Sequence, residues 1–284
     1  MVANPCASPT ALIGARDQKK GGSQIPSQGN KNNGGIDPLN FYSGGMEAAP
    51  ALEEEEDVAK KGSSKEGVAM DASEEDVAKG AATIADYEAI ADGFHQGNLN
   101  HDVSQNLEAL LQALGGRPGL DILDLGCAGG RDLVALTKRG HRAVGLEGGS
   151  RFCQLARATS GCEVLQQNLC ELQLPAEAYD GIFANAVLFH VPSTALPMVL
   201  EGLHRALRPG GVLFSSNAHG FGEDREGWTD GRTPGNSSWV CWMSEASWTS
   251  TMQDAGFELL DLYYRPPGKP REQQPFLATV WRKA

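Results

Sequence analysis

The sequence lacks any uninterrupted apolar run near the roughly 20 residues that a membrane-spanning helix requires. It also lacks a basic segment followed by an apolar segment at its start, which a secretory signal would show. We therefore predict a cytoplasmic protein that neither crosses a membrane nor is secreted. The alternative is organelle targeting, because the first stretch of about 35 residues is poor in acidic residues and carries scattered Arg, Lys and Ser, which weakly resembles a transit peptide.

Paired cysteines and basic clusters are missing as well. The six cysteines stand singly, with no C-x-x-C pair and no histidine spacing of the structural zinc type, which predicts free thiols in a reducing compartment and no metal site. The formal net charge is -12 and no Lys/Arg-rich run occurs, so the overall field would repel a phosphate backbone. Nucleic acid is therefore not the expected substrate or partner.

Residues 1–80 are rich in Gly, Ser, Asn, Lys and Glu and show neither helical nor strand periodicity. This composition predicts a disordered N-terminal extension over 1–80 and a folded domain over 81–284. A polar hexapeptide occurs twice in the extension, as Glu55–Lys60 and Glu74–Lys79. Two such short copies cannot stack into a solenoid, and we interpret them as a duplication within a linker.

After Thr83 the pattern changes to alternating helices and strands. Ser104 is a good N-cap for a helix whose leucines follow at helical spacing until Gly115–Gly116. Strands are then expected over 120–125, 143–146, 164–165, 181–188 and 212–214, and helices over 131–139, after Ser150, after Ser193 and after Ser244. This alternation predicts a doubly wound α/β fold with a mostly parallel sheet, helices on both faces and ligands at the carboxyl ends of the strands.

The long connection Asn217–Met243 contains Gly and Asp together with Trp228, Trp239 and Trp242. Long loops over the carboxyl edge of such a sheet are usually lids or disordered segments, and three tryptophans favour a lid. The alternative is that the rings only pack the loop onto the domain.

The most informative segment is Asp121–Asp132, in which an apolar strand runs into a glycine-rich turn. Gly126, Gly129 and Gly130 allow a tight bend and a close approach of a ligand to the backbone. About twenty residues later, Glu147 ends the second strand with a carboxylate suited to accept two hydrogen bonds from a ribose diol. The turn reads G-x-x-G-G rather than the nicotinamide fingerprint G-x-G-x-x-G, which argues against a dehydrogenase.

Together with these residues, the segments Tyr179–Ala186 and Leu207–Gly211 make the chain similar to the class I S-adenosylmethionine-dependent methyltransferases of the small-molecule type. The resemblance covers about residues 86–283. It implies a Rossmann-like sheet of seven strands with an antiparallel C-terminal hairpin, for which 257–264 and 276–281 are the remaining strand-like runs.

The resemblance also implies which residues bind the cofactor, S-adenosylmethionine. Asp124 and Gly126 would lie beside its methionine part, and Glu147 would hold its ribose. The rest of the site would comprise Asn168 and Leu169 at the adenine, Asn185 and Ala186 along the methyl-donor channel, and Cys127, Ala128, Gly129, Gly130 and Gly148 in the loops.

Two positions depart from the family pattern. Ala128 replaces the middle glycine of the usual D-x-G-C-G-x-G loop, and Asn168 replaces the aspartate common after the third strand. The methyl group of Ala128 is tolerated if its φ is negative, and the side-chain oxygen of Asn168 still accepts a hydrogen bond from the adenine amino group. These departures keep open an alternative function, a catalytically inactive methyltransferase-like module whose acidic N-terminal tail binds a protein partner.

Methyl transfer from a sulfonium is an in-line displacement, which needs alignment and, for a protonated acceptor, a base. His190, just beyond the fourth predicted strand, is placed to act as that base, and the alternative is that it only hydrogen-bonds to backbone at the strand end. The Asn/Asp-Pro-Pro-Tyr/Phe motif of the resembling nucleic-acid amino-methyltransferases is replaced by Ala184–Val187. We therefore predict a methyltransferase for a small-molecule acceptor, with the acceptor atom left open.

The connection between the last two predicted strands is stiffened by prolines and a glycine over 266–270 and carries Arg265 and Arg271. Rigid arginines favour forked recognition of a carboxylate or phosphate. We expect at least one of the two to bind an anionic group of the acceptor. The alternative is solvated surface charge or an ion pair with Glu272.

Overall fold

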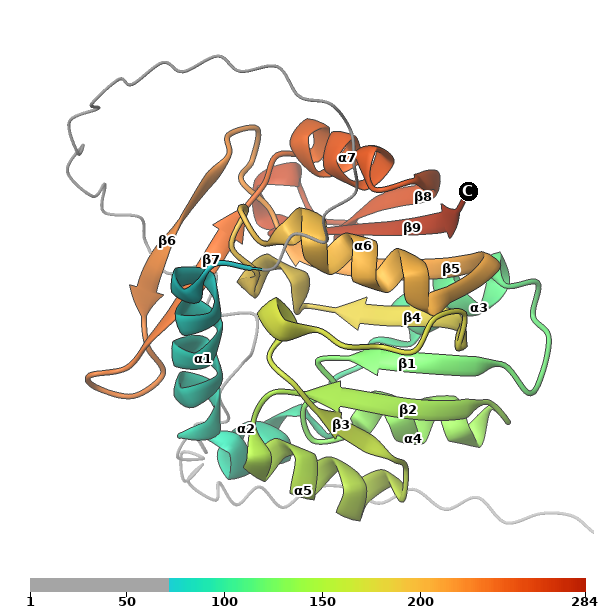
Figure 1. Cartoon of the computed structure of the whole chain (residues 1–284), viewed down its shortest axis with the longest axis horizontal. Coiled ribbons are helices and arrows are strands. Elements are labelled where there is room, and N and C mark those ends of the chain that lie inside the picture. The colour runs from blue at the N-terminus through green and yellow to red at the C-terminus, as the bar shows by residue number, and fades with distance from the viewer. Residues whose placement is uncertain (1–71) are drawn as a thin grey trace, which may run out of the picture. The chain divides into compact units, whose positions relative to one another are not determined.

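The computed structural model describes residues 72–284, and its central element is a seven-stranded sheet (Figure 1). The strand order is β3-β2-β1-β4-β5-β9-β8, in which β9 is antiparallel to both of its neighbours. The strands are β1 (Asp121–Leu125), β2 (Arg142–Glu147), β3 (Val164–Gln166), β4 (Tyr179–Asn185), β5 (Leu207–Ala218), β8 (Phe257–Arg265) and β9 (Phe276–Lys283). The predicted doubly wound sheet with an antiparallel C-terminal hairpin is confirmed.

Helices cover both faces of this sheet. One face carries α3 (Ser104–Ala113), α4 (Arg131–Lys138) and α5 (Ser150–Ser160), and the other carries α6 (Leu196–Ala206) and α7 (Glu245–Asp254). Short 3-10 turns η1 (Leu169–Glu171), η2 (Leu188–His190) and η3 (Arg271–Gln273) complete the connections. Within residues 72–284, none of the helices combines the length and the apolar content that a bilayer crossing demands.

Strand β1 shows why these apolar runs form the core. Ile122 packs on one face of the sheet with the leucines of α3, whereas Leu123 and Leu125 pack on the other face with α6. Successive side chains of a strand point to opposite faces, so a strand covered by helices on both sides has apolar residues at consecutive positions. This burial holds the strand ends, and the loops that follow them, in fixed places.

Two further helices, α1 (Glu74–Glu88) and α2 (Ala91–Asn98), lie beside the carboxyl ends of the strands (Figure 1). Ser73 caps α1, because its Oγ accepts a hydrogen bond from Asp76 N at 3.1 Å. The predicted extension over 1–80 is therefore wrong for residues 74–80, which include the second copy of the hexapeptide. The first copy, and the rest of the extension up to residue 71, lie outside the described residues.

The predicted long loop over 217–243 is largely a β-hairpin. Its strands β6 (Arg225–Asp230) and β7 (Ser237–Trp242) form a separate antiparallel pair. β7 packs along α1, where Trp239 N donates to Thr83 Oγ1 at 2.9 Å and Lys79 Nζ lies 4.3 Å from the centre of a Trp239 ring. Trp228 meets Trp239 edge-on. The prediction of a loop is thus wrong for most of this segment, and Trp239 packs the hairpin onto α1.

The start of α3 also differs from the prediction. Ser104 is the first helical residue rather than the N-cap, a position that Val103 occupies. The Ser104 N–H donates to Asp102 Oδ1 at 2.9 Å, so the aspartate supplies the acceptor that the prediction assigned to the serine. Helix ends are the least well determined features of a sequence pattern, because several polar residues compete for the same cap.

Replacing Asp76 by Ala should lower the free energy of unfolding of the full-length chain by about 1–3 kcal/mol. The Asp76 carboxylate is 4% exposed and accepts hydrogen bonds from Ser73 Oγ at 2.8 Å and Thr194 Oγ1 at 2.9 Å, and both hydroxyls would lose this acceptor. Denaturant unfolding measures the change. Glu74→Ala, at the exposed first residue of α1, is the control and should change stability by less than about 0.5 kcal/mol. Equally small effects in both variants would exclude residues 74–80 from the folded domain.

Candidate functional site

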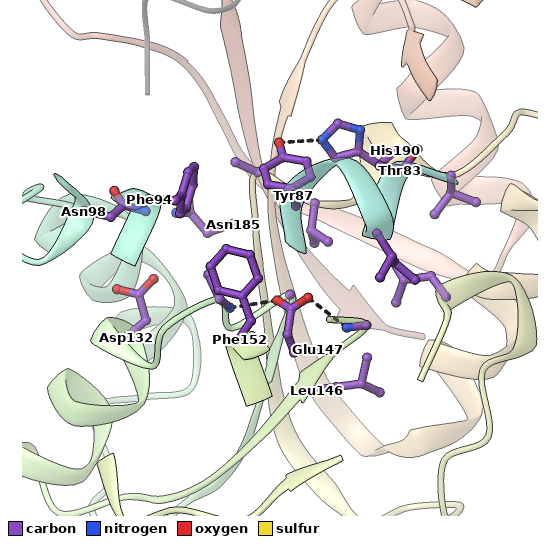
Figure 2. Close-up of a pocket in the computed structure, with 18 of the residues that line it drawn as sticks. Thr83, Tyr87, Phe94, Asn98, Asp132, Leu146, Glu147, Phe152, Asn185 and His190 are labelled. Atoms are coloured by element: carbon purple, nitrogen blue, oxygen red, sulfur yellow. Dashed lines mark hydrogen bonds between the residues drawn. The ribbon is translucent and has the colours of Figure 1, made fainter. Parts of the chain in front are cut away.

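A cavity lies at the carboxyl edge of the sheet, between the strand ends and helices α1 and α2 (Figure 2). The loops that follow β1, β2 and β4 line it from one side, and α1, α2 and the turn between β6 and β7 line it from the other. Parallel strands bring successive loops to the same edge of a sheet. The cavity therefore combines residues that are distant in the sequence.

The turn after β1 is built from left-handed residues. Gly126 has a φ of 71° and Gly130 a φ of 85°. A Cβ atom on Gly126 would lie 2.5 Å from the Val187 side chain, and one on Gly130 would lie 2.9 Å from the backbone of Ala156. Both conformation and space therefore require glycine at these two positions.

Ala128 lies at the apex of the same turn with a φ of 44°. The negative φ under which a methyl group is tolerated without strain is therefore not adopted, and the left-handed conformation costs roughly 1–2 kcal/mol for a residue with a side chain. This conformation directs the Ala128 N–H toward Glu147 Oε2, to which it donates at 2.9 Å. A hydrogen bond to a buried carboxylate is of comparable strength and offsets the strain.

The carboxylate of Glu147 joins two loops of the site (Figure 2). Its Oε1 accepts from Gly148 N at 2.8 Å and from Gly149 N at 3.2 Å, and its Oε2 accepts from the turn after β1. Burial raises the pKa of Glu147, and the hydrogen bonds from the three backbone N–H groups oppose this shift. Glu147 thus presents a carboxylate of fixed orientation at the cavity wall.

The predicted cofactor-binding residues separate into two groups. Those that line the cavity are Gly126, Ala128, Glu147, Gly148, Asn168, Leu169, Asn185 and Ala186, together with the predicted base His190. Those that do not line it are Asp124, Cys127, Gly129 and Gly130. The structure therefore brings the first group together around one cavity, whereas the second group lies at the end of β1 and in the following turn without lining the cavity.

The residues of the second group have specific surroundings. The Asp124 carboxylate is buried, and its Oδ2 has no hydrogen-bond partner among residues 72–284. Burial, together with the nearby Asp132, raises the pKa of Asp124 well above its ordinary value. A Cβ atom on Gly129 would lie 1.9 Å from His95 Nδ1, so this glycine lets α2 approach the turn. Burial also raises the pKa of the Cys127 thiol, which makes it unreactive.

Asn168 connects the cavity to α1. Its Oδ1 accepts from Cys170 N at 3.1 Å, and its Nδ2 donates to the carbonyl oxygen of Val77 at 3.0 Å. A Cβ atom on Gly80 would lie 2.4 Å from Asn168 Oδ1, so α1 contacts the amide directly. One lone pair of Oδ1 is left for a ligand donor, and adenine recognition by Asn168 stays a prediction.

Tyr87 and His190 form a hydrogen-bonded pair in the cavity wall (Figure 2). His190 Nδ1 lies 2.8 Å from the carbonyl oxygen of Trp239, which can only accept, so Nδ1 carries the proton. The Tyr87 hydroxyl lies 2.9 Å from Nε2 and therefore donates to it. Burial lowers the pKa of His190 to about 4, so the ring is neutral near pH 7. The alternative role, a hydrogen bond to backbone, is realised at Nδ1, while Nε2 faces the tyrosine.

An ion pair fixes the β6–β7 hairpin to α1 beside this pair. Arg232 Nη1 lies 2.7 Å from Asp86 Oδ2, and both side chains are almost fully buried. Ser238 Oγ also donates to Asp86 at 2.6 Å. The Arg232 guanidinium lies 3.4 Å from the centre of the Tyr87 ring, so the hairpin holds the phenol in place.

Sequence reasoning missed the residues that α1, α2 and the hairpin contribute to the cavity: Thr83, Ile84, Tyr87, Phe94, Asn98 and Arg232. One signal was present, because Ile84 and Tyr87 are spaced i, i+3 and share one helix face. No local signal identifies Arg232, whose partner Asp86 is 146 positions away. These residues become part of the site only through tertiary contacts.

The two arginines near the C-terminal hairpin lie in different places. Arg265, the last residue of β8, lines the cavity. Arg271 does not, because its guanidinium stacks on Tyr264 at 3.1 Å from the ring centre and donates to the carbonyl oxygen of Gln274 at 3.2 Å. Arg265 alone of the two is placed to meet a ligand in this cavity.

A family model and two curated relatives that match this chain are named as methyltransferases. Residues 96–262 match the family model described as a methyltransferase domain. The chain is 30% identical over 145 residues to the ubiquinone biosynthesis O-methyltransferase of Pseudomonas aeruginosa, covering 48% of this chain and 62% of that protein. It is 34% identical over 124 residues to the malonyl-[acyl-carrier protein] O-methyltransferase of Xylella fastidiosa, covering 42% of this chain and 41% of that protein. The matched region thus spans about half of the length of these curated relatives.

Solved structures share the fold. The 1,6-didemethyltoxoflavin-N1-methyltransferase of Burkholderia thailandensis, solved with 1,6-didemethyltoxoflavin and S-adenosylhomocysteine, has a TM-score of 0.58 and 22% identity, covering 72% of this chain and 88% of that one. An S-adenosylmethionine-dependent methyltransferase of Mesorhizobium loti has a TM-score of 0.51 and 22% identity, covering 61% and 95%. Because the residues that match the family model make up more than half of the sequence and include β1 to β5 with their cavity loops, the chain belongs to the methyltransferase domain family.

Proposed function

We propose that this protein transfers a methyl group from S-adenosylmethionine to a small-molecule acceptor by in-line displacement. The observation that carries the proposal is the Glu147 carboxylate, which backbone N–H groups fix at the end of β2 and which faces the cavity. Oε2 accepts one hydrogen bond and has a lone pair for a ribose hydroxyl. On Oε1, the longer bond from Gly149 N at 3.2 Å is the weaker one and gives way to a second hydroxyl.

The other residues around the cavity fit this cofactor. Ile84 and Leu169 supply apolar surface on the side of β3, where an adenine would lie beyond the ribose. On the other side of Glu147, the cavity-lining Asp132 suits the cationic amino group of the methionine part, and the buried Oδ2 of Asp124, which has no hydrogen-bond partner within residues 72–284, lies near Asp132. When bound, S-adenosylmethionine supplies an electrophilic methyl group on a sulfonium. Asn185 and Ala186, at the end of β4, would border that methyl group.

The acceptor side of the cavity is largely aromatic. Phe94, Phe152 and Phe276 line it together with Tyr87, and Phe94 meets both Tyr87 and Phe152 edge-on with ring centres 5.7 Å apart. Apolar walls exclude water from the reacting atoms and hold an acceptor by its apolar surface. This lining supports a small molecule as the acceptor and supports alignment as the main contribution of the protein to catalysis.

The Tyr87–His190 pair is the proposed proton acceptor. Methyl transfer to a hydroxyl makes the proton on its oxygen strongly acidic, so a base with a pKa of about 4 is sufficient to remove it late in the reaction. The acceptor proton passes to the Tyr87 oxygen, and the Tyr87 proton passes along the existing 2.9 Å hydrogen bond to His190 Nε2. In this arrangement Tyr87 touches the acceptor and His190 receives the proton.

We place this activity in the cytoplasm. Cys127, Cys153, Cys162, Cys170 and Cys241 are free thiols, which suits a reducing compartment. Microscopy of the full-length chain carrying a C-terminal tag would test the location, and an organellar signal would favour the transit-peptide alternative.

Turnover of a metabolite mixture with labelled S-adenosylmethionine is the experiment that tests the proposed function. Transfer of the label to a small molecule supports it. Cofactor binding without transfer to any component of the mixture would favour the alternative of an inactive methyltransferase-like module that binds a protein partner.

Glu147→Ala should weaken the binding of S-adenosylmethionine and S-adenosylhomocysteine by on the order of 2–4 kcal/mol, or about 30- to 1,000-fold in Kd. The variant removes the charged acceptor of the ribose hydroxyls and releases the turn at Ala128. Isothermal titration measures both affinities. Glu163→Ala removes an exposed carboxylate outside the cavity and is the control. Equal affinities for Glu147→Ala and the wild-type protein would refute this assignment of the cofactor site.

Tyr87→Phe and His190→Ala should each lower kcat by about 10²- to 10⁴-fold while cofactor affinity stays within a few-fold. The double variant should lose no more than the worse single variant, because the two side chains act as one proton acceptor. Losses that multiply in the double variant would contradict the pair. Since the pKa of His190 is about 4, its protonation should leave the wild-type rate unchanged from pH 8 to pH 6, which a pH profile checks.

A further inference from the structure

Arg265 lies at the end of the cavity opposite the proposed adenine side. β9 is antiparallel to both β5 and β8, so β8 runs parallel to β4 and β5 and its last residue reaches their carboxyl edge. Asn185 pairs with Ser216 of β5, and Arg265 pairs with Phe276 of β9. Ser216, Phe276 and Arg265 all line the cavity. They form a wing of the cavity beyond β4, which we call the β5–β8 wing.

This arginine differs from the other two arginines of the cavity. Arg131 pairs with Asp132 at 2.7 Å, and Arg232 pairs with Asp86 at 2.7 Å. The Nε of Arg265 is buried without a hydrogen-bond partner, and no ion pair within residues 72–284 includes its guanidinium. A buried donor on a charged group is costly when it is left unpaired.

The charge of Arg265 is retained despite this environment. Burial lowers the pKa of Arg265, and nearby Tyr263 and Asp102 raise it. An arginine begins from so high a pKa that it stays protonated near pH 7. The β5–β8 wing therefore carries one positive charge that acts on Asp102 at a distance but forms no ion pair within residues 72–284, and its Nε donor has no partner there.

We propose that Arg265 binds a carboxylate or phosphate group of the methyl acceptor, so that the protein selects small acceptors with an apolar body and one anionic end. The proposal rests on the proposed methyltransferase function. The forked donors of a guanidinium match the geometry of both anions. Phe276, buried beside Arg265 in the same wing, would contact the apolar body of the acceptor.

The carboxylate of the cofactor is the other possible source of this anion, and the strand order argues against it. The cofactor-binding residues follow β2, β1 and β4, which are neighbours in the sheet, whereas β5 and β9 separate β4 from β8. Arg131 begins α4 directly after the glycine turn and is the arginine nearest in sequence to the methionine part. We therefore assign Arg265 to the acceptor side of the methyl group. Because the charge of Arg131 also acts on Arg265, the S-adenosylhomocysteine affinity of Arg265→Gln decides between the two sources of the anion.

The test uses the full-length chain saturated with S-adenosylhomocysteine and three probes of similar size: benzoate, phenyl phosphate and the neutral benzamide. Thermal shift and isothermal titration follow binding at millimolar probe concentrations. We expect at least one of the two anions to bind and to raise the melting temperature, and benzamide to bind at least 10-fold more weakly. Binding of benzamide as strong as that of the anions, or no binding of either anion to the wild-type protein, would overturn the proposal.

Arg265→Gln keeps hydrogen-bond donors but removes the charge, and it should weaken binding of the anionic probe by roughly 10- to 100-fold. Arg271→Gln, outside the cavity, is the matched control and should bind the anion as the wild-type protein does. Undiminished anion binding by Arg265→Gln would overturn the proposal. A loss of 10-fold or more in S-adenosylhomocysteine affinity in Arg265→Gln would also overturn it and assign the arginine to the cofactor. Failure of the wild-type protein to bind S-adenosylhomocysteine at all would instead refute the proposed function.

Discussion

The contact on which the site depends is the one between the Glu147 carboxylate and the backbone N–H groups of the loops after β1 and β2. A carboxylate in a buried position needs donors, and the turn supplies one only when Ala128 adopts a left-handed conformation. The glycines on either side of Ala128 make that conformation possible, and the parallel pairing of β1 with β2 brings both loops to the same edge. The hydrogen bond from Ala128 N–H to Glu147 thus offsets both the strain in the turn and the cost of burying the charge.

Helices α1 and α2 and the β6–β7 hairpin close this site by a second set of close contacts. The absence of a side chain at Gly80 leaves space for Asn168, and its absence at Gly129 leaves space for His95. The buried ion pair between Asp86 and Arg232 connects α1 to the hairpin. Breaking one partner of such an ion pair leaves an uncompensated buried charge. Closure of the cavity is therefore specified by polar contacts as well as by apolar area, and it holds Tyr87 against His190.

The sequence predicted the sheet and the cavity loops well, because a strand buried on both faces needs an apolar run and a left-handed turn needs glycine. Gly126, Gly130 and Glu147 follow from those local requirements. Residues 74–80 could not be assigned in the same way, since the hydrogen bond that ties Asp76 to the domain comes from Thr194, 118 positions along the chain. Arg232 was hidden for the same reason. The left-handed φ of Ala128 does not follow from the sequence, because local preference disfavours a left-handed alanine and the compensating hydrogen bond goes to Glu147, in the next loop.

The distribution of charge also separates the scaffold from the ligand site. The chain carries a formal net charge of -12, yet three arginines line its cavity. The cavity therefore contains positive side chains although the protein as a whole is negative. Arg131 and Arg232 form ion pairs with acidic neighbours. They therefore hold structural elements in place and add little to the positive electrostatic potential of the cavity. In a region of low dielectric, the field of one guanidinium without a direct ion pair is stronger than that of distant surface carboxylates, which solvent screens. A negatively charged protein can therefore attract an anionic ligand at Arg265, because the local field in the cavity, and not the net charge, determines what binds.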